Sequence, residues 1–595
     1  MCGISGFLTS STCPPRELLV RMADALQHRG PDDRGYFYDQ AAGLGLAHNR
    51  LSIIDLTAAG HQPMVGRDGR TALVYNGEVY NSKELRKELE AAGHMFVSRC
   101  DTEVVLRAYE QWGRECVNRF CGMFAFALWD DRRKELFLAR DPLGMKPLYY
   151  TTEKTGLSGF YFASELKAFR AVQGFRLSVS RAAVNSFMEF GYMFDENRTA
   201  LEGVWKLPPG HTLVVRADGQ AGRPQAYHIL PSQPDAGETS EGLLCERLHS
   251  TLNTVVAQHL VADVPVAILL SGGLDSSLMA ALAARSAKVT TVTMGFAGAR
   301  FDERPFARDV AAHIASDHHE VTITGKEIRD SLEETASVFD DLFDDWGTLS
   351  TRLLYLKCRQ MGIKVVLVGE GADELFGGYP VFNVAGRLRG PTLWRLFRLW
   401  HMYGCRRYGR TMWPFFRTME EYLRGASGDW FHSVRLFELR RQLPNHYVMK
   451  VDKASMSVSV EARAPYLDRR IVDIACRAPR ATLLKGEQNK AMLRAVAARY
   501  DLLPPGIVDR RKFGASIAMS WMDDDPGFRA YARDVVLCRE AEWTERLRLR
   551  RAMEAYFDRQ RHGFGFPHPL SLFRIIAWRL MLLTLWSRSI TNREM

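Results

Sequence analysis

A glycine-containing loop with an acidic residue is the first segment that could do chemistry. It reads Ser271-Gly-Gly-Leu-Asp-Ser-Ser277 and follows an apolar run over residues 264–270, which is typical of a strand buried on both faces. Residues 278–287 have a helical pattern, with Ser276 and Ser277 placed to cap the helix. A strand, a glycine turn and a helix N-terminus favour a bound anion, because free N–H groups point outward. Asp275 suits a divalent metal that accompanies a phosphate chain.

The same loop also has an ordinary structural interpretation as a strand-to-helix turn. Its spacing is not the G-x-x-x-x-G-K-[ST] of a Walker loop, and no lysine follows it. The two glycines by themselves therefore leave both interpretations open.

A cysteine at position 2 is a second candidate for chemistry. Removal of Met1 would place the Cys2 thiol beside a free α-amino group, whose reference pKa of about 7.7–8.0 suits a general base near neutrality. The alternative is a small residue of the core, because most cysteines are buried for packing.

Three carboxylates among glycines form a third candidate. Glu370, Asp373 and Glu374 follow the predicted strand 364–368, within the segment 369–379. Carboxylates at a strand end are costly to bury unless a cation or a proton-bearing group meets them. The alternative is a solvated acidic turn.

The elements that must position these residues divide the chain into two domains. Many short alternating strands are expected in residues 1–215, and a segment rich in Pro, Gly and Ser at 216–242 indicates a linker. In residues 243–595 strands alternate with helices, for example the strand 289–296 and the helix 348–360. This alternation predicts an α/β doubly wound parallel sheet with added helices, which binds its ligand at the C-terminal ends of the strands.

Composition excludes several classes of protein. The chain has 595 residues, of which 46% are hydrophobic, and no run approaches 18 apolar residues, so no membrane span is expected. Ten cysteines show no paired metal spacing, and together with the absence of a signal segment they favour a reducing cytoplasmic location. The net charge of +10 is spread along the chain, which argues against a nucleic-acid partner.

Seven short motifs in the N-terminal third resemble the class II glutamine amidotransferase domain. They are His28–Asp32, Ala47–Asp55, Gly60–Pro63, Tyr75–Asn81, Cys100–Glu103, Gly122–Phe126 and Ala139–Gly144. The resemblance extends to about residue 215. It implies an α+β N-terminal-nucleophile sandwich, with two stacked antiparallel sheets and helices outside.

This resemblance implies roles for six residues. Cys2 would attack the side-chain amide of glutamine as a thiolate, and the oxyanion would be stabilised by Asn76 and the Gly77 N–H, at roughly 10²–10³ in rate per donor. Arg50 would bind the carboxylate of glutamine, and the ammonium group would meet two carboxylates, Glu78 and Asp101. Asn76-Gly77 is also a hairpin turn signal, and Arg50 could be a surface cation.

The loop at 271–277 resembles the pyrophosphate-binding loop of ATP pyrophosphatases, and the whole chain resembles the glutamine-hydrolysing asparagine synthetase family. Further support comes from Asp317–Glu320, Lys450–Met456, Val460–Asp468 and Arg511–Gly514. In that family a carboxylate attacks the α-phosphorus of ATP to give an acyl-adenylate and pyrophosphate. Ammonia from the glutaminase site travels through an internal channel and displaces AMP.

The resemblance also implies a nucleotide site and a metal site. ATP and its pyrophosphate would be bound by Leu270, Ser271, Gly272, Gly273, Asp275, Ser276, Met294, Gly295 and Gly369. Asp275 and Asp373 would ligate Mg²⁺, and Lys490 would stabilise charge at the adenylate. Glu370 lies where a proton could leave the attacking ammonium.

Only two residues, Arg463 and Val368, bear on which carboxylate is the acceptor. Aspartate is the default, and Arg463 is our candidate for binding the acceptor carboxylate, with an ion pair to Glu461 or Asp468 as the alternative. Where the family usually has a serine, this chain has Val368, which cannot donate a hydroxyl hydrogen bond. The second hypothesis therefore keeps the chemistry and changes the acceptor to a sugar acid, a peptide or a natural-product intermediate.

Residues 386–442 interleave arginines with aromatic residues and are the least family-like region. A helical subdomain with packed aromatics is expected there, and a surface for a large anionic ligand is the alternative. Residues 571–589 predict an amphipathic helix that packs on the core. A catalytically silent scaffold is disfavoured because the site residues are intact, and a homodimer is expected only by analogy with the family.

Overall fold

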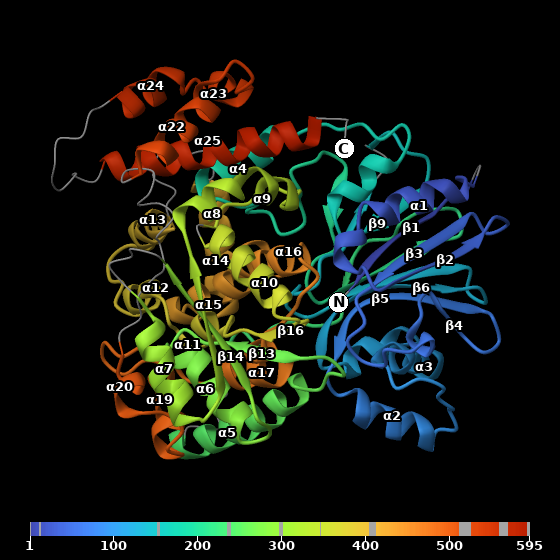
Figure 1. The fold of residues 1–595 in the computed structure, drawn as a ribbon, viewed down its shortest axis with the longest axis horizontal. Helices are drawn as coiled ribbons and strands as arrows, with labels where there is room; N and C mark the ends of the chain where they lie inside the picture. The colour runs from blue at the N-terminus through green and yellow to red at the C-terminus, as the bar shows by residue number, and fades with distance from the viewer. Residues whose placement is uncertain are drawn as a thin grey trace.

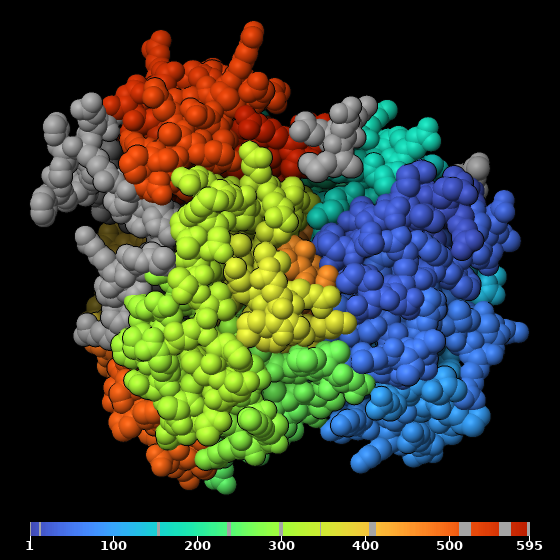
Figure 2. All heavy atoms as spheres, in the orientation of Figure 1, coloured from blue at the N-terminus to red at the C-terminus, as the bar shows by residue number. Residues whose placement is uncertain are grey.

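The two predicted domains lie side by side in the computed structural model, and the N-terminus lies where they meet (Figure 1). Figure 2 shows the first domain, in blue to teal, against green and yellow segments of the second domain across a continuous boundary. The structure describes residues 2–10, 13–151, 155–234, 240–296, 302–345, 347–403, 412–510, 525–558 and 569–591.

The first domain is a sandwich of two six-stranded antiparallel sheets. One sheet has the order β10 (Val204–Lys206), β8 (Tyr149–Thr151), β9 (Phe160–Ala163), β1 (Gly3–Leu8), β3 (Leu44–Arg50) and β2 (Asp33–Asp39). The other has the order β12 (Gln225–Ala226), β11 (His211–Arg216), β7 (Glu135–Arg140), β6 (Gly122–Asp130), β5 (Thr71–Val79) and β4 (Met64–Val65). This confirms the predicted sandwich.

Apolar side chains fill the space between the two sheets. Ile4 and Leu46 of one sheet pack in the same buried cluster as Val74 and Leu138 of the other. The remaining outer faces are covered by helices, which include α1 (Arg16–Asp24), α2 (Ser82–Ala91), α3 (Asp101–Trp112) and α4 (Arg181–Phe190). The alternation of inward and outward side chains therefore buries both faces of each sheet.

The second domain is built on a five-stranded sheet in which all neighbours are parallel. Its order is β15 (Asp317–Ile323), β14 (Thr290–Phe296), β13 (Val266–Leu269), β16 (Val365–Leu367) and β17 (Glu461–Arg463). Helices pack on both sides of it (Figure 1); they include α5 (Glu241–His259), α6 (Leu274–Ala284), α7 (Arg304–His313), α10 (Thr348–Gln360), α16 (Val448–Met456), α17 (Arg469–Arg477) and α19 (Ala491–Arg499). The predicted doubly wound sheet is confirmed.

The rest of the second domain is helical. The helices of the arginine- and aromatic-rich region are α13 (Thr392–Met402), α14 (Met412–Gly425) and α15 (Trp430–Phe437), and residues 404–411 of that region lie outside the described residues. Trp400 and Phe415 are buried there, as predicted, whereas Trp394 and Trp413 are exposed.

The C-terminal helices form a separate group at the top of Figure 1. They are α22 (Pro526–Leu537), α23 (Glu542–Arg546), α24 (Arg550–Asp558) and α25 (Pro569–Thr591). Helix α25 buries Trp578, Leu580 and Met581, which confirms that the predicted terminal helix packs on the core. Within the described part of the chain, no helix combines the length and apolar character needed to cross a bilayer.

Two local expectations differ from the structure. Helix α6 begins at Leu274, with Gly273 at its N-cap and no side-chain cap, so Ser276 lies in the first turn instead of capping the helix. The sheet of the first domain also extends into the expected linker, because Gln225 and Ala226 of β12 pair with β11. Residues 235–239 of that linker lie outside the described residues.

Candidate active sites

A cavity of about 380 Å³ gathers most of the residues predicted for the glutaminase. Its lining includes Cys2, Arg50, Gly77, Glu78 and Asp101. Cys2 directly precedes β1, and the others come from β3, β5 and the first turn of α3, so both sheets of the sandwich contribute. The stacking of the two sheets therefore brings together side chains that are up to a hundred residues apart in sequence.

Cys2 lies directly before β1 and is buried. Its backbone N–H donates to Asn76 Oδ1 at 2.9 Å, which ties the start of one sheet to a strand of the other. Burial raises the pKa of the Cys2 thiol, and a backbone hydrogen bond from Leu51 and the charge of Arg50 oppose this rise. The thiol therefore needs a nearby proton acceptor before it can act as a nucleophile.

Asn76 and Gly77 present hydrogen-bond donors beside Cys2. The Nδ2 group of Asn76 is buried and has no hydrogen-bond partner among the described residues. A Cβ atom on Gly77 would lie 2.3 Å from the carbonyl oxygen of Met123, so only glycine fits this close approach of two strands. An unpaired buried donor is expensive, and it becomes useful when an anionic oxygen forms next to it.

Arg50 is fixed at the end of β3 by backbone carbonyls. Its guanidinium donates to Thr57 O at 2.9 Å and to Asp55 O. The side chain is buried and lines the cavity, so it is not the surface cation that was the alternative. A rigidly held guanidinium can bind a carboxylate with little loss of side-chain entropy.

Glu78 and Asp101 place two buried carboxylates in the same cavity. Asp101 accepts hydrogen bonds from Tyr75 Oη at 2.6 Å and from the Val79 N–H at 2.9 Å. Burial raises the pKa of Glu78 well above its ordinary value, and the Asp101 charge adds to the rise. Burial also raises the pKa of Asp101. A cationic group entering the cavity would relieve this electrostatic cost.

Two residues of β17 reach the glutaminase cavity from the second domain. Glu461 lines the cavity, and Arg463 donates to Glu461 at 2.6 Å and to Glu78 at 3.2 Å. The remaining nitrogen of Arg463 donates to the carbonyls of His259 and Val261, each at 2.7 Å. Arg463 is fully buried, and every guanidinium nitrogen is engaged.

Arg463 therefore forms the ion pair with Glu461 that was the alternative to acceptor binding. Each of its three guanidinium nitrogens donates within a network that joins β17 to Glu78 of the glutaminase cavity. Local sequence does not reveal the contact between β17 and β5, because it depends on how the two domains dock. The cavity role of Glu461 was missed for the same reason.

The predicted phosphate loop lies at the C-terminal end of β13. Ser276 Oγ accepts from the Ser271 N–H at 3.2 Å and contacts Ser271 Oγ at 3.0 Å, which folds the loop back over the start of α6. Gly272 has a φ of +67°, and a Cβ atom there would lie 2.6 Å from the backbone of Phe306. The loop thus needs glycine for both its conformation and its packing against α7.

Lys490 connects the two predicted magnesium ligands. Its Nζ lies 2.5 Å from Asp275 Oδ2 and 2.7 Å from Asp373 Oδ1. Burial alone would lower the pKa of Lys490, but the two carboxylates raise it above its ordinary value. Lys490 also has a φ of +55°, a conformation that is costly for a residue with a side chain and is held by its surroundings. The three predicted residues therefore converge on one point.

The residues present suit a magnesium ion that arrives with a nucleotide. Asp275 and Asp373 are close enough to share the Lys490 ammonium, so one cation can contact both carboxylates. The described residues contain no group of three or more His, Cys, Asp or Glu side chains that would hold a metal alone. This matches Mg²⁺, which proteins usually bind through one or two carboxylates together with substrate phosphates.

The other predicted nucleotide residues lie at the same edge of the sheet. Leu270 and Gly369 follow β13 and β16, and Met294 and Gly295 lie in the last three residues of the neighbouring strand β14. A Cβ atom on Gly369 would lie 3.4 Å from both Asp275 Cβ and the Ser276 N–H, so this glycine packs directly against the loop.

Glu370 and Val368 flank Gly369. Glu370 is half-buried. Burial lowers the pKa of Lys450, but the charges of Asp345 and then of Glu370 raise it, and the net result is a pKa above the ordinary value. Val368 is buried, and its N–H donates to Arg463 O at 2.8 Å. Asp373 and Glu374 lie in the first turn of the short helix α11 (Ala372–Phe376), and Glu374 is buried, so the acidic segment is not a solvated turn.

Arg510 is a residue at this edge that sequence reasoning missed. It donates to the Gly272 carbonyl at 3.0 Å, and its guanidinium lies 3.8 Å from the centroid of the Phe306 ring. It precedes the Arg511–Gly514 motif, which lies outside the described residues. The adjacent basic motif was the only signal that could have found it.

Two family models match separate parts of the chain. Residues 1–228 match the family model of a glutamine amidotransferase domain, and residues 247–588 match that of asparagine synthase. Asparagine synthetase [glutamine-hydrolyzing] 3 of Bacillus subtilis is 30% identical over 86% of both chains. Asparagine synthetase [glutamine-hydrolyzing] 1 of the same organism is 30% identical over 88% of both chains.

A third relative has a different name. It is the amidase chry2 of Gibberella zeae, which is 34% identical over 64% of this chain and 60% of its own. Together, the two domain matches and the two relatives aligned over most of the chain show that this protein belongs to the glutamine-hydrolysing asparagine synthetase family, enzymes of glutamine- and ATP-dependent amide formation.

Proposed function

We propose that this enzyme converts aspartate to asparagine in two coupled steps. The first domain hydrolyses glutamine to glutamate and ammonia at Cys2. The second domain adenylates the side-chain carboxylate of aspartate with ATP and releases pyrophosphate. Ammonia then displaces AMP. The two B. subtilis relatives, named as asparagine synthetases and aligned over most of this chain, support aspartate as the acceptor.

In the first step, Cys2 attacks the amide carbon of the glutamine side chain. The α-amino group that Cys2 would carry after loss of Met1 takes the thiol proton, since the burial-raised pKa of the thiol disfavours spontaneous ionisation. The unpaired Nδ2 of Asn76 and the N–H of Gly77 receive the negative oxygen. Arg50 binds the glutamine carboxylate, and Glu78 and Asp101 bind its ammonium group.

In the second step, the loop Ser271–Ser276 holds the phosphates of ATP at the N-terminus of α6. Mg²⁺, held by Asp275 and Asp373, would neutralise the charge that develops on the departing pyrophosphate. Lys490 moves from its two carboxylates toward the α-phosphoryl oxygens and stabilises charge at the adenylate. Once ammonia has attacked the acyl carbon of the adenylate, Glu370 accepts the proton that the new C–N nitrogen loses as AMP departs.

The observation that carries this proposal is the convergence of Asp275, Asp373 and Lys490 beside the glycine loop. This cluster lies beside the N-terminus of α6, at the C-terminal edge of the parallel sheet. This is the edge at which doubly wound folds bind nucleotides.

The test is pyrophosphate release with a panel of carboxylic acids, measured with ATP and either glutamine or ammonia. We expect aspartate to give the highest kcat/KM and the products to be AMP and pyrophosphate. Formation of ADP would contradict adenylation. Activity with other acids and none with aspartate would contradict the choice of acceptor alone.

A different carboxylate acceptor is the second candidate. Val368 carries no hydroxyl at a buried position next to the nucleotide edge, where the family usually has a serine. A relative named as an amidase also aligns over part of the chain. The same panel of acids separates this candidate from the first.

A further inference from the structure

Helix α13 exposes large apolar side chains at the surface of the second domain. It lies at the edge of that domain, on the side away from the first domain (Figure 1). Four of its side chains are at least 40% exposed, namely Leu393, Trp394, Phe397 and Met402. Trp413, in the first turn of the neighbouring helix α14, is 60% exposed. We call these five side chains the α13 patch.

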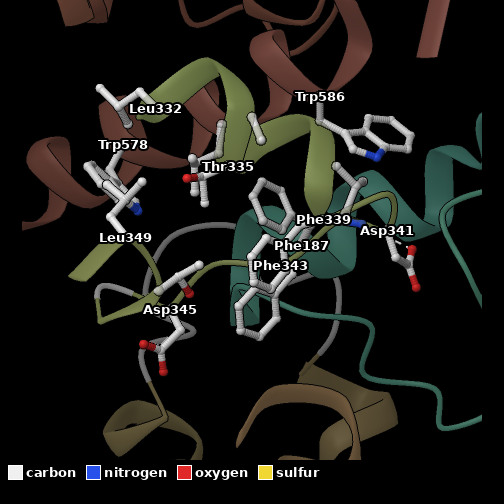
Figure 3. A pocket seen from close by; sticks show the side chains of 14 residues that line it. Phe187, Leu332, Thr335, Phe339, Asp341, Phe343, Asp345, Leu349, Trp578 and Trp586 are labelled. Atoms are coloured by element: carbon white, nitrogen blue, oxygen red, sulfur yellow. Dashed lines mark hydrogen bonds between the residues drawn. The ribbon is translucent and has the colours of Figure 1, made fainter. Parts of the chain in front are cut away.

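The α13 patch differs from the aromatic clusters inside the protein. Figure 3 shows one such cluster, in which Phe187, Phe339 and Trp578 gather between α4, α9 (Leu332–Val338) and α25, and all three are buried. In contrast, the patch contains both tryptophans that are exposed in the described part of the chain. Single exposed apolar residues are common on protein surfaces, whereas a group of them marks an interaction site.

The apolar residues of the patch are not the ones that attach α13 to the domain. Within the helix they are neighbours or lie about one turn apart, so they share one side. The opposite side carries Leu396, Leu399 and Trp400, which are buried against the domain. A surface helix is normally polar on its outer side. The apolar outer side of α13 is therefore available for a partner.

The sequence around the patch carries positive charge only. Residues 375–419 contain eight arginines and no aspartate or glutamate. One of these arginines, Arg387, pairs with Glu487 outside the segment at 3.6 Å. The exposed arginines among the described residues of the segment are Arg387, Arg389, Arg398 and Arg417. An anionic partner would therefore meet several guanidinium groups and no carboxylate from this segment.

Apolar side chains next to arginines fit an anionic membrane surface better than a nucleic acid. Tryptophan and phenylalanine rings suit the boundary between lipid headgroups and acyl chains, and arginines attract anionic headgroups. The Arg398 guanidinium lies 4.9 Å from the centroid of the Trp394 ring, so charge and ring are presented together. A polynucleotide would stack its bases on the rings but would gain little from the aliphatic side chains of Leu393 and Met402.

We propose that the α13 patch docks this protein on the surface of an anionic lipid membrane. Leu393, Trp394 and Phe397 enter the boundary between headgroups and acyl chains, and the exposed arginines contact the lipid phosphate groups. The contact is peripheral and reversible, because only one side of a short helix enters the lipid. The proposal goes beyond the proposed function and does not depend on which acceptor the enzyme uses.

The probe is a vesicle of phosphatidylcholine with about 30% phosphatidylglycerol, compared with a vesicle of phosphatidylcholine alone. Sedimentation of the full chain with increasing amounts of lipid gives an apparent affinity for each vesicle. The anionic vesicle should bind at least about tenfold more tightly, and high salt should weaken this binding because it screens the headgroup charges. Absence of binding to the anionic vesicle, or equal binding to both vesicles, would overturn the proposal.

Two pairs of variants connect the binding to the patch. Leu393→Ser and Leu243→Ser are matched, because both leucines are 58% exposed and only Leu393 lies in the patch. Leu393→Ser should weaken vesicle binding about fivefold or more, and Leu243→Ser should change it less than about twofold. Arg398→Gln should weaken binding about fivefold, with Arg223→Gln, which alters an exposed arginine of the first domain, as its control.

Glutaminase activity and circular dichroism verify that each variant is folded, since none of the altered residues lines the glutaminase cavity. Equal binding by Leu393→Ser and Leu243→Ser would show that the vesicle contacts another face and would overturn the assignment. Tighter binding of single-stranded poly(U) than of the anionic vesicle, weakened by Arg398→Gln, would show that the patch serves a nucleic acid and would also overturn it.

Discussion

The glutaminase cavity has an unpaired buried amide donor beside it and carboxyl groups whose pKa burial raises, whereas the loop after β13 pairs its charges with one another. In the cavity, Asn76 Nδ2 has no partner among the described residues, and burial raises the pKa of Glu78 and of Asp101. At the loop, Lys490 lies between Asp275 and Asp373. One site is thus preorganised for a substrate that carries the missing charges, and the other must exchange its own partners when a nucleotide arrives.

This difference has a physical origin in the two substrates. Glutamine carries one ammonium and one carboxylate, so fixed groups of opposite charge can recognise it without rearrangement. ATP carries several negative charges, and two exposed carboxylates would repel it. A lysine that neutralises Asp275 and Asp373 reduces this repulsion.

The largest effect is expected for Cys2→Ala. It removes the nucleophile, so glutamine-dependent synthesis should fall by about 10⁴-fold or more. Synthesis from free ammonia should stay within about twofold of the unmodified enzyme, because Cys2 does not contact the loop after β13. Cys100→Ala, which alters another cysteine of the same cavity, is the control. Loss of the ammonia-dependent reaction in Cys2→Ala would show that the two sites do not work separately.

Lys490→Ala should have the opposite effect to Cys2→Ala, because it should impair adenylation and leave glutamine hydrolysis intact. It leaves Asp275 and Asp373 without their ammonium partner, and adenylation should slow by about 10³-fold. Glutaminase activity should be unchanged. Pyrophosphate release and glutamate formation are measured side by side, with Lys485→Ala, which removes an exposed lysine paired to Glu241, as the control. Normal pyrophosphate release in Lys490→Ala would remove this residue from the proposed mechanism.

Asn76→Asp tests the unpaired donor. The aspartate keeps the oxygen that accepts the Cys2 N–H but lacks Nδ2, so kcat for glutamine hydrolysis should fall by about 10²–10³-fold with little change in KM. Asn81→Asp is the control, because Asn81 lies outside the cavity lining and bonds to Cys121 and Arg119. If KM rises and kcat is constant, Asn76 binds the ground state instead of the oxyanion.

The fold could be predicted from sequence where the pattern is local. Alternating apolar residues predicted the strands of the sandwich, and the apolar run before Ser271 predicted β13 together with the loop and helix that follow it. The residues of the glutaminase cavity could be selected only through family motifs, since their contacts span the two sheets.

The contacts between the two domains could not be predicted from the sequence. Arg463 and Glu461 lie two residues apart on β17, and nothing local indicates that they face Glu78 of the first domain. Such a contact depends on the docking of two separately patterned units, which apolar periodicity does not encode.

The variant Arg463→Met tests the ion pairs that connect the two domains. It leaves Glu78 and Glu461 buried without their cation, and breaking a buried pair costs about 3–5 kcal/mol. The unfolding temperature should therefore fall clearly, and KM for glutamine should rise. KM for the acceptor should remain within about twofold, since Arg463 has no nitrogen directed to it. A large rise in acceptor KM without loss of stability would restore the acceptor role.

The smallest expected effect is a pH dependence that belongs to one site only. Burial raises the pKa of both Glu78 and Asp101, so as pH falls these carboxylates take up protons earlier than ordinary ones and lose the charge that binds the glutamine ammonium. KM for glutamine should therefore rise roughly three- to tenfold as the pH is lowered, beginning above the range in which ordinary carboxyl groups take up protons. Glu78→Gln should flatten this profile, and KM for ATP, measured over the same range with the free ammonia concentration held constant, should change less. A flat glutamine profile in the unmodified enzyme would mean that the cavity is already neutralised, and the contrast between an open and a self-paired charge arrangement would then fail.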